Sequence, residues 1–209
     1  MNEKYCAPCT LHMKDANGKK YLLTVERDNE PDDPTEMMAS HLVCFHRRYQ
    51  IGENHNWDLS ELQDWLRENR DEVVVKPVYL MDHGTQSIST RDFGDRWDSG
   101  QIGYCYVIRD EVDPEHRIPD WRTEVSKWIE SDVEMYDTFL RGDVYSYTLE
   151  EQTHIYDEVK CPCCGETIKI NERDDWEEIE SCCGFYGDDL QENGIFDSIG
   201  HDLIVESEE

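Results

Sequence analysis

Cysteine supplies the most reactive side chains in this chain of 209 residues, which contains nine of them. The run Cys161-Pro162-Cys163-Cys164-Gly165 holds a Cys-x-x-Cys pair followed by glycine. This is the pattern of a zinc knuckle, a tight turn that points two thiolates to one side. We expect a cytoplasmic protein, where thiols stay reduced and clustered cysteines bind metals more often than they form disulfides. The run therefore predicts a structural zinc ion with Cys161 and Cys164 as ligands.

Two cysteine pairs are candidates for the remaining zinc ligands. Cys182 and Cys183 follow at about 20 residues, near the spacing of a second knuckle, although vicinal cysteines rarely chelate one ion together. Cys6 and Cys9 form another Cys-x-x-Cys pair. The sequence leaves both pairs open, and the alternative for all these residues is a set of free thiols.

A second group of polar residues has types that suit catalysis. Asp82, His83 and Asp98 lie near the ends of predicted strands and offer two carboxylates and an imidazole. Such a set fits a metal-dependent hydrolase or general acid–base chemistry. No spacing signature accompanies it, and aspartates in loops commonly accept backbone N–H bonds within turns. We favour turn stabilisation over catalysis, so that an enzyme is the less favoured interpretation.

The net charge constrains what this protein binds. The chain carries 49 Asp and Glu against 20 Lys and Arg, a formal net charge of −29 at pH 7. Such a surface repels nucleic acid and anionic membranes and attracts basic protein surfaces. We therefore predict no direct nucleic-acid binding and no membrane association. Since duplex DNA carries about one charge per 1.7 Å, 29 charges match roughly 50 Å of duplex.

One predicted helix concentrates part of this charge. Apolar residues at helical spacing predict a helix over Asp120–Arg141, which Gly142 ends. Its polar face carries five carboxylates, which are the predicted partner-binding residues: Glu124, Glu130, Asp132, Glu134 and Asp137. Three of them share one side of the helix, because residues three, four and seven apart are neighbours there. We expect this row to face a basic partner, and a merely solvated face is the alternative.

The spacing of the hydrophobic residues, together with residues typical of turns, predicts the helices and strands that position these residues. A hairpin is expected around a two-residue Asn17-Gly18 turn, and a helix is expected from Asp58, with Glu61 completing its capping box. Alternating or apolar runs predict strands at residues 41–45, 73–81, 86–90, 102–108, 144–150 and 153–159. The last two runs are expected to pair with each other.

These elements predict a single α+β domain over residues 1–209, with a mostly antiparallel sheet and two main helices. A small Cys-rich, zinc-knuckle-like subregion is expected at 158–187, an acidic loop at 28–36 and an acidic tail at 206–209. No run of 18 apolar residues and no apolar signal region at the N-terminus is present, in line with a cytoplasmic protein.

Two segments, Trp97-Asp98-Ser99-Gly100-Gln101 and Gly184-Phe185-Tyr186-Gly187, are the most specific part of a resemblance that spans residues 41–187. Over this span the chain resembles a family of bacteriophage and mobile-element proteins that has no established activity. Family members read Asp-His-Ser-Gly where this chain has Asp82-His83-Gly84-Thr85, which argues against a serine nucleophile there. The resemblance implies a viral or mobile-element context rather than a chemistry.

Acidity and this context together favour an anti-defence or host-takeover protein. Its carboxylates would engage the basic surface of a host nucleic-acid-handling or defence protein as DNA does, with electrostatic steering and a steep loss of affinity in salt. Two alternatives stay open: the hydrolase built on Asp82, His83 and Asp98, and a zinc-stabilised adaptor without mimicry. A homodimer is one arrangement that the sequence allows.

Overall fold

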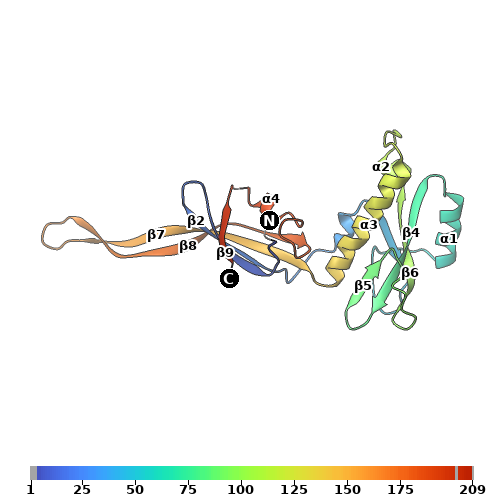
Figure 1. Cartoon of the computed structure of the whole chain (residues 1–209), viewed down its shortest axis with the longest axis horizontal. Helices are drawn as coiled ribbons and strands as arrows, with labels where there is room; N and C mark the ends of the chain where they lie inside the picture. Colours follow the sequence, from blue (N-terminus) through green and yellow to red (C-terminus); the bar gives the residue numbers. More distant parts are fainter. Residues whose placement is uncertain (1–3, 201, 209) are drawn as a thin grey trace. The chain divides into compact units, whose positions relative to one another are not determined.

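The computed structural model describes residues 4–200 and 202–208 and divides the chain into two compact units (Figure 1). One unit combines the residues up to Pro31 with those from Val144 onward, and the other is Asp32–Asp143. Two units arise because the chain leaves its first sheet after residue 27 and rejoins that sheet at residue 144. Strands dominate the first unit, whereas helices hold more residues than strands in the second, and the strand pairs between the described residues are antiparallel, as predicted.

The first unit is built on a five-stranded sheet in the order β8-β7-β2-β1-β9. β1 (Cys9–Lys14) and β2 (Lys20–Arg27) form the predicted hairpin. Its loop has three residues rather than two, because the Asp15 N–H donates to the Lys19 carbonyl and Gly18 takes a φ of 81°. That left-handed backbone is accessible to glycine at little cost. The remaining elements are β7 (Val144–Lys160), β8 (Thr167–Tyr186), α4 (Ile195–Ser198) and β9 (Ile204–Glu208).

The core of the first unit lies on one face of this sheet. Leu11, Leu23 and Leu149 are fully buried on neighbouring strands, because alternate residues of a strand point to the same face. Leu190 and Ile195, from the segment after β8, cover them. This core supports only the part of β7 that pairs with β2.

Two strand predictions for this unit are wrong. Residues 144–150 and 153–159 are one continuous strand, β7, whose partner is β8, a strand of 20 residues that we did not predict. Residues 171–181 are so rich in charged side chains that β8 shows no alternation of apolar and polar residues. The predicted acidic tail is structured as well: residues 206–208 belong to β9, where Glu206 accepts a hydrogen bond from Lys14 at 2.6 Å. Residue 209 lies outside the described residues.

The second unit is a four-stranded sheet in the order β3-β6-β4-β5 with helices on both faces. Its strands are β3 (His41–Cys44), β4 (Val73–Asp82), β5 (Gln86–Ser89) and β6 (Ser99–Ile108). Its helices are η1 (Pro34–Glu36), α1 (Leu59–Glu68), α2 (Arg109–Val112) and α3 (Trp121–Leu140). Within this unit β5 is an edge strand, paired only with β4.

The two predicted main helices form where expected. α1 begins with the full capping box, in which Asp58 accepts the Ser60 N–H at 2.8 Å and Glu61 accepts the Asp58 N–H at 3.3 Å. Its Leu62 and Leu66 pack on one face of the sheet. α3 packs a buried stripe that includes Val125 against the other face. The predicted acidic loop contains η1, which is capped by Asp33.

Candidate metal centre and acidic ribbon

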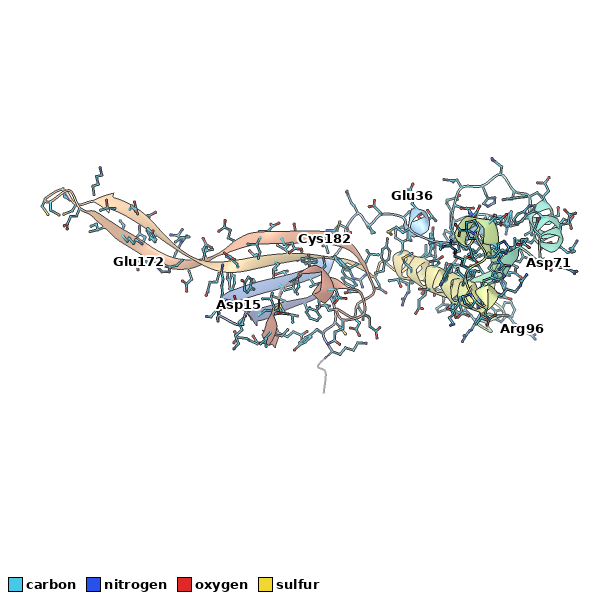
Figure 2. The ribbon with its side chains drawn as sticks, turned by 90° about the horizontal axis from the view of Figure 1, so that it is seen from above. Asp15, Glu36, Asp71, Arg96, Glu172 and Cys182 are labelled. Atoms are coloured by element: carbon cyan, nitrogen blue, oxygen red, sulfur yellow. The ribbon has the colours of Figure 1, made fainter. Side chains whose placement is uncertain are left out.

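The outer part of the β7–β8 hairpin extends past the rest of its sheet (Figure 1). The pairing of β7 with β2 ends at Glu151, whereas the pairing of β7 with β8 continues to Lys160 and Thr167. We call residues 150–181 the ribbon. Figure 2 shows side chains projecting along it, Glu172 among them. Most of these side chains are exposed, because two strands alone have no second layer to cover them.

The ribbon is strongly acidic. It carries eleven carboxylates against three basic side chains, a net charge of −8. The carboxylates are Glu150, Glu151, Asp157, Glu158, Glu166, Glu172, Asp174, Asp175, Glu177, Glu178 and Glu180. The paired arms run from Glu150 to Lys160, so at 3.3 Å per residue the ribbon with its turn is about 35–40 Å long and presents one carboxylate per roughly 3.5 Å. This approaches the density of one DNA strand, about one charge per 3.4 Å, and is well below that of a duplex.

Three cysteines meet at the turn that closes the ribbon. The Cys161 N–H donates to the Glu166 carbonyl and the Gly165 N–H to the Cys161 carbonyl, both at 2.8 Å. Gly165 takes a φ of 77°, which lets the chain reverse. The sulfurs of Cys161, Cys163 and Cys164 all lie within 4.8 Å of one another. Two thiolates on one tetrahedral zinc, each at about 2.3 Å, lie about 3.8 Å apart, so the cluster can bind a metal once Cys161 and Cys163 move slightly apart.

One of these thiols is activated. The hydrogen bond from the Cys163 thiol, together with the backbone N–H groups of Cys163 and Cys164, lowers the pKa of Cys161 to about 6. The two sulfurs lie 2.8 Å apart, and the same bond raises the pKa of Cys163. Thiolates are the form that binds metals. Cys161 therefore offers a metal ligand at neutral pH.

The structure brings Cys161 and Cys164 together as predicted and adds Cys163, which we had omitted. The Cys-x-x-Cys pattern drew attention to the outer pair, although the Cys-x-Cys spacing within the same run was a visible signal. Each cysteine of this run can supply one sulfur, because the tight turn brings all three sulfurs together.

Neither predicted second pair lies near this turn. Cys182 and Cys183 are in β8, and Cys182 faces Tyr147. Tyr147 precedes Cys161 by 14 residues of extended chain, about 45 Å. Cys9 lies in the sheet at the same end as Tyr147, as the pairing of Cys9 with Val25 and of Val25 with Tyr147 shows, and Cys6 precedes it by three residues and bridges to Asp189. The structure therefore places both pairs away from the metal-binding turn.

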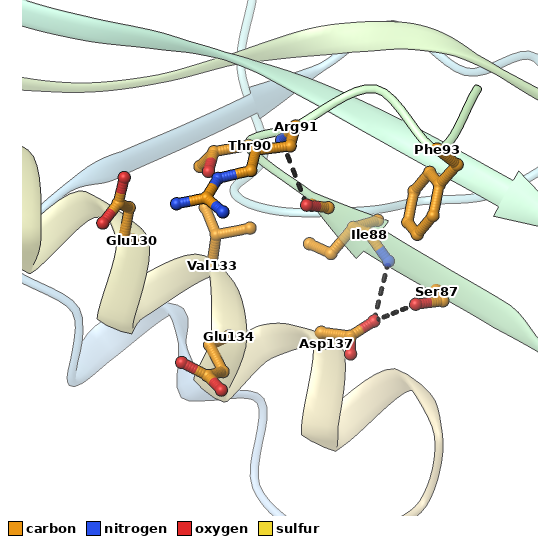
Figure 3. Close-up of a pocket in the computed structure, with 10 residues that line it drawn as sticks. Ser87, Ile88, Thr90, Arg91, Phe93, Glu130, Val133, Glu134 and Asp137 are labelled. Carbon is orange, nitrogen blue, oxygen red and sulfur yellow. Dashed lines mark hydrogen bonds between the residues drawn. The ribbon is translucent and has the colours of Figure 1, made fainter.

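The predicted carboxylate row on α3 makes contacts within its own unit (Figure 3). Asp137 accepts hydrogen bonds from the Ser87 hydroxyl and the Ile88 N–H, both at 2.7 Å. Glu130 forms an ion pair with Lys76. With Glu134 they line a shallow pocket of about 440 Å³ that also contains Arg91 and Phe93.

The other two helix carboxylates also have partners. Asp132 accepts the Ser40 N–H at 3.0 Å and its hydroxyl at 2.6 Å, while Glu124 pairs with Lys127 at 2.7 Å. The contacts of Asp132 and Asp137 join α3 to its own sheet and to the loop before β3. Part of the acidic face of α3 is therefore engaged in contacts within its own unit, and the carboxylates do not form a free row of charges.

Asp82, His83 and Asp98 lie close together, but their side chains have different partners. His83 bonds Asp98 at 2.9 Å, whereas the Asp82 carboxylate accepts from Arg48 at 2.7 Å and from Tyr49 at 3.0 Å. The carboxylate that accepts backbone N–H bonds in this turn is Asp95, which we had not predicted. Asp95 and Asp98 therefore form hydrogen bonds close to this turn, whereas Asp82 bonds the segment that contains Arg48 and Tyr49.

Comparisons with known protein families, curated proteins and solved structures find no match to this chain. Within residues 4–200 and 202–208, no helix combines the length and apolar composition that crossing a membrane requires. The ribbon and its cysteine turn are the features of this chain whose chemistry bears on function.

Proposed function

We propose that this protein is an anti-defence or host-takeover factor of a phage or mobile element, which uses the ribbon to occupy a basic nucleic-acid-binding groove on a host protein. The observation that carries this proposal is the clustering of eleven carboxylates on one narrow, exposed hairpin. Six of these carboxylates fall within residues 172–180 of β8, with Arg173 as the one basic residue among them.

The shape of the ribbon favours insertion into a groove. The two backbones of the ribbon lie about 5 Å apart, and its outer part is a single layer of two strands. Both faces of its outer part expose charge, and a groove that surrounds a nucleic-acid strand would contact both. Long-range attraction would speed association, and high salt would weaken it.

Zinc is the metal we propose for the cysteine turn. Thiolate ligands suit zinc, and a structural ion contributes directly to folding free energy. The ribbon lacks a core of its own, and a two-stranded hairpin is marginally stable by itself. A metal that joins Cys161, Cys163 and Cys164 would hold the turn closed and keep the ends of β7 and β8 in register.

Charge-neutral variants test the ribbon. The test variant carries Glu172→Gln, Asp174→Asn, Glu177→Gln and Glu178→Gln. The matched control carries Glu30→Gln, Glu36→Gln, Glu68→Gln and Asp71→Asn, which make the same change in net charge at exposed positions outside the ribbon. Binding to a fluorescent oligo-arginine peptide, measured by anisotropy at two salt concentrations, reports the attraction.

We expect the ribbon variant to bind about tenfold more weakly and to depend less on salt, since four exposed charge pairs contribute about 0.2–1 kcal/mol each. The control should stay close to wild type. Equal losses in both variants would mean that net charge alone attracts the peptide and that the ribbon has no special part. Pull-down from host lysate with both variants then identifies the partner whose capture depends on the ribbon.

A further inference from the structure

An apolar patch adjoins the cysteine turn on one face of the ribbon. Val159 pairs with Ile168, and directly paired residues share a face. Ile170 lies two residues further along β8 and so points the same way, as does Cys161 two residues after Val159. The three apolar side chains are 43%, 47% and 38% exposed. The cysteine turn and this patch therefore form one continuous surface, which we call the tip.

The tip differs in charge from the rest of the ribbon. Residues 155–170 carry three carboxylates and two lysines, a net charge of −1. Residues 172–180 carry six carboxylates and one arginine, a net charge of −5. Two tips can therefore approach each other, whereas two acidic segments would repel.

The metal site within one chain is incomplete. Structural zinc is almost always bound by four ligands in a tetrahedron, and the turn supplies three sulfurs. The Glu166 carboxylate lies 3.7 Å from the Cys164 sulfur, but it is not within reach of the whole cluster. The other cysteine pairs of the same chain lie far from the turn. The turn itself offers no fourth sulfur, and the turn of a second copy is a source of one.

We propose that the tip is a zinc-dependent contact between two copies of this chain. Two turns bring six thiolates together, which complete two four-coordinate zinc ions when two of the thiolates bridge both metals. The apolar patch of each copy, made of Val159, Ile168 and Ile170, then packs on the same patch of the other copy. This contact removes three apolar side chains of each copy from water. This inference rests on the zinc proposed above, and it leaves the acidic segment 172–180 of both copies exposed.

The mass of the full-length protein in solution tests this contact without any partner protein. Protein stripped with a chelator under reducing conditions should be a monomer of 24.7 kDa by sedimentation equilibrium. One equivalent of zinc should double this mass, and renewed chelation should reverse the change. Ile168→Asp should bind zinc and lose at least tenfold in dimer affinity. Cys182→Ser with Cys183→Ser, remote from the tip, should dimerise like wild type.

A further variant separates this arrangement from a closed site within one chain. Glu166→Gln should retain both zinc and the dimer, because the fourth ligand is a sulfur of the second copy. Wild-type protein that binds one zinc and remains a monomer would overturn the proposal, and so would a dimer that survives chelation. This experiment contains no basic peptide, so its outcome does not depend on the outcome of the ribbon test. Cobalt in place of zinc gives a second measurement, since its absorption distinguishes four sulfur ligands from three.

Discussion

The carboxylate of Asp137 on α3 accepts the backbone N–H of Ile88 on β5 at a distance of 2.7 Å. β5 is an edge strand, so this N–H points away from its one partner strand and would otherwise depend on water. The Ser87 hydroxyl donates to the same oxygen at 2.7 Å, and Arg141 pairs with the other oxygen at 3.1 Å. Asp137, which we expected to face a binding partner, thus accepts a backbone N–H at the edge of its own sheet.

Replacing Asp137 should therefore destabilise the second unit. Asp137→Ala removes hydrogen bonds to a charged acceptor, which contribute about 1.5–3 kcal/mol. Glu134→Ala, one turn earlier on the same face, is the control and should change the free energy of unfolding by about 0.5 kcal/mol or less. Urea denaturation measures both variants. Two equally mild effects would show that the contact with β5 contributes little.

The cysteines should differ sharply in reactivity. In metal-free protein, Cys161 should react with iodoacetamide with a midpoint near pH 6, because hydrogen bonds hold its pKa at about 6. Cys44 and Cys105 serve as internal references, since burial raises the pKa of each thiol to about 12. Peptide mass spectrometry over pH 5–9 follows each site. Cys163→Ala should move the midpoint of Cys161 upward, and an unchanged midpoint would contradict the proposed hydrogen bond.

His41 should make stability depend on pH. Its Nδ1 lies 3.2 Å from Glu53 and its Nε2 lies 2.9 Å from Glu111. Burial alone lowers the pKa of His41, but the bonds to these carboxylates outweigh burial and raise it above 6.5. A raised pKa means that the folded protein binds the proton more tightly than the unfolded chain. The stabilisation is therefore full below about pH 6.5 and is lost as the pH rises through the folded pKa.

The measurement for His41 is the stability of wild type relative to His41→Gln across pH 5–9. The advantage of wild type should be largest at the acid end and shrink toward pH 9. Glu111→Gln should reduce this pH dependence, since it removes the partner of Nε2. An advantage that grew with pH would reverse the sign and exclude a charged His41 in the folded state.

The turn before β6 should depend on Asp95 rather than on the neighbouring tryptophan. Asp95 accepts the N–H groups of Trp97 at 2.7 Å and Asp98 at 2.9 Å. These bonds lower the pKa of Asp95. Asp95→Ala should lower the midpoint of thermal unfolding by a few degrees. Trp97, which is 94% exposed, should tolerate replacement by alanine without change, as calorimetry would show.

Local patterns in the sequence predicted the local elements of this fold well. The capping box at Asp58 and the apolar stripe of α3 depend on neighbours within a turn or two, so they can be recognised from sequence spacing. β8 was missed because its long run of charges follows no alternating burial: both of its faces are exposed beyond the sheet. A strand without a buried face lacks the period-2 signal on which strand prediction depends.

The candidate site was predictable only where its residues are close in sequence. Cys161 and Cys164 could be identified because one turn brings them together. The choice of further ligands needed the length of β7, which separates that turn from Cys182 by tens of ångströms. Likewise, the acidic residues of α3 could be placed on one face, but Ser87 and Ile88 reach Asp137 only through tertiary packing.

The chain order of the first sheet has a consequence for synthesis on the ribosome. Val25 pairs with Tyr147, a residue 122 positions later, so β1 and β2 must wait for the second half of the chain. Translation at roughly 5–20 residues per second makes this wait about 6–24 s. The continuous segment Asp32–Asp143 can fold during that interval, because its strands and helices are complete within it. Throughout that interval the β1–β2 segment lacks β7 and the residues that cover its core, so the apolar side chains of Leu11 and Leu23 stay exposed to water and to chaperones.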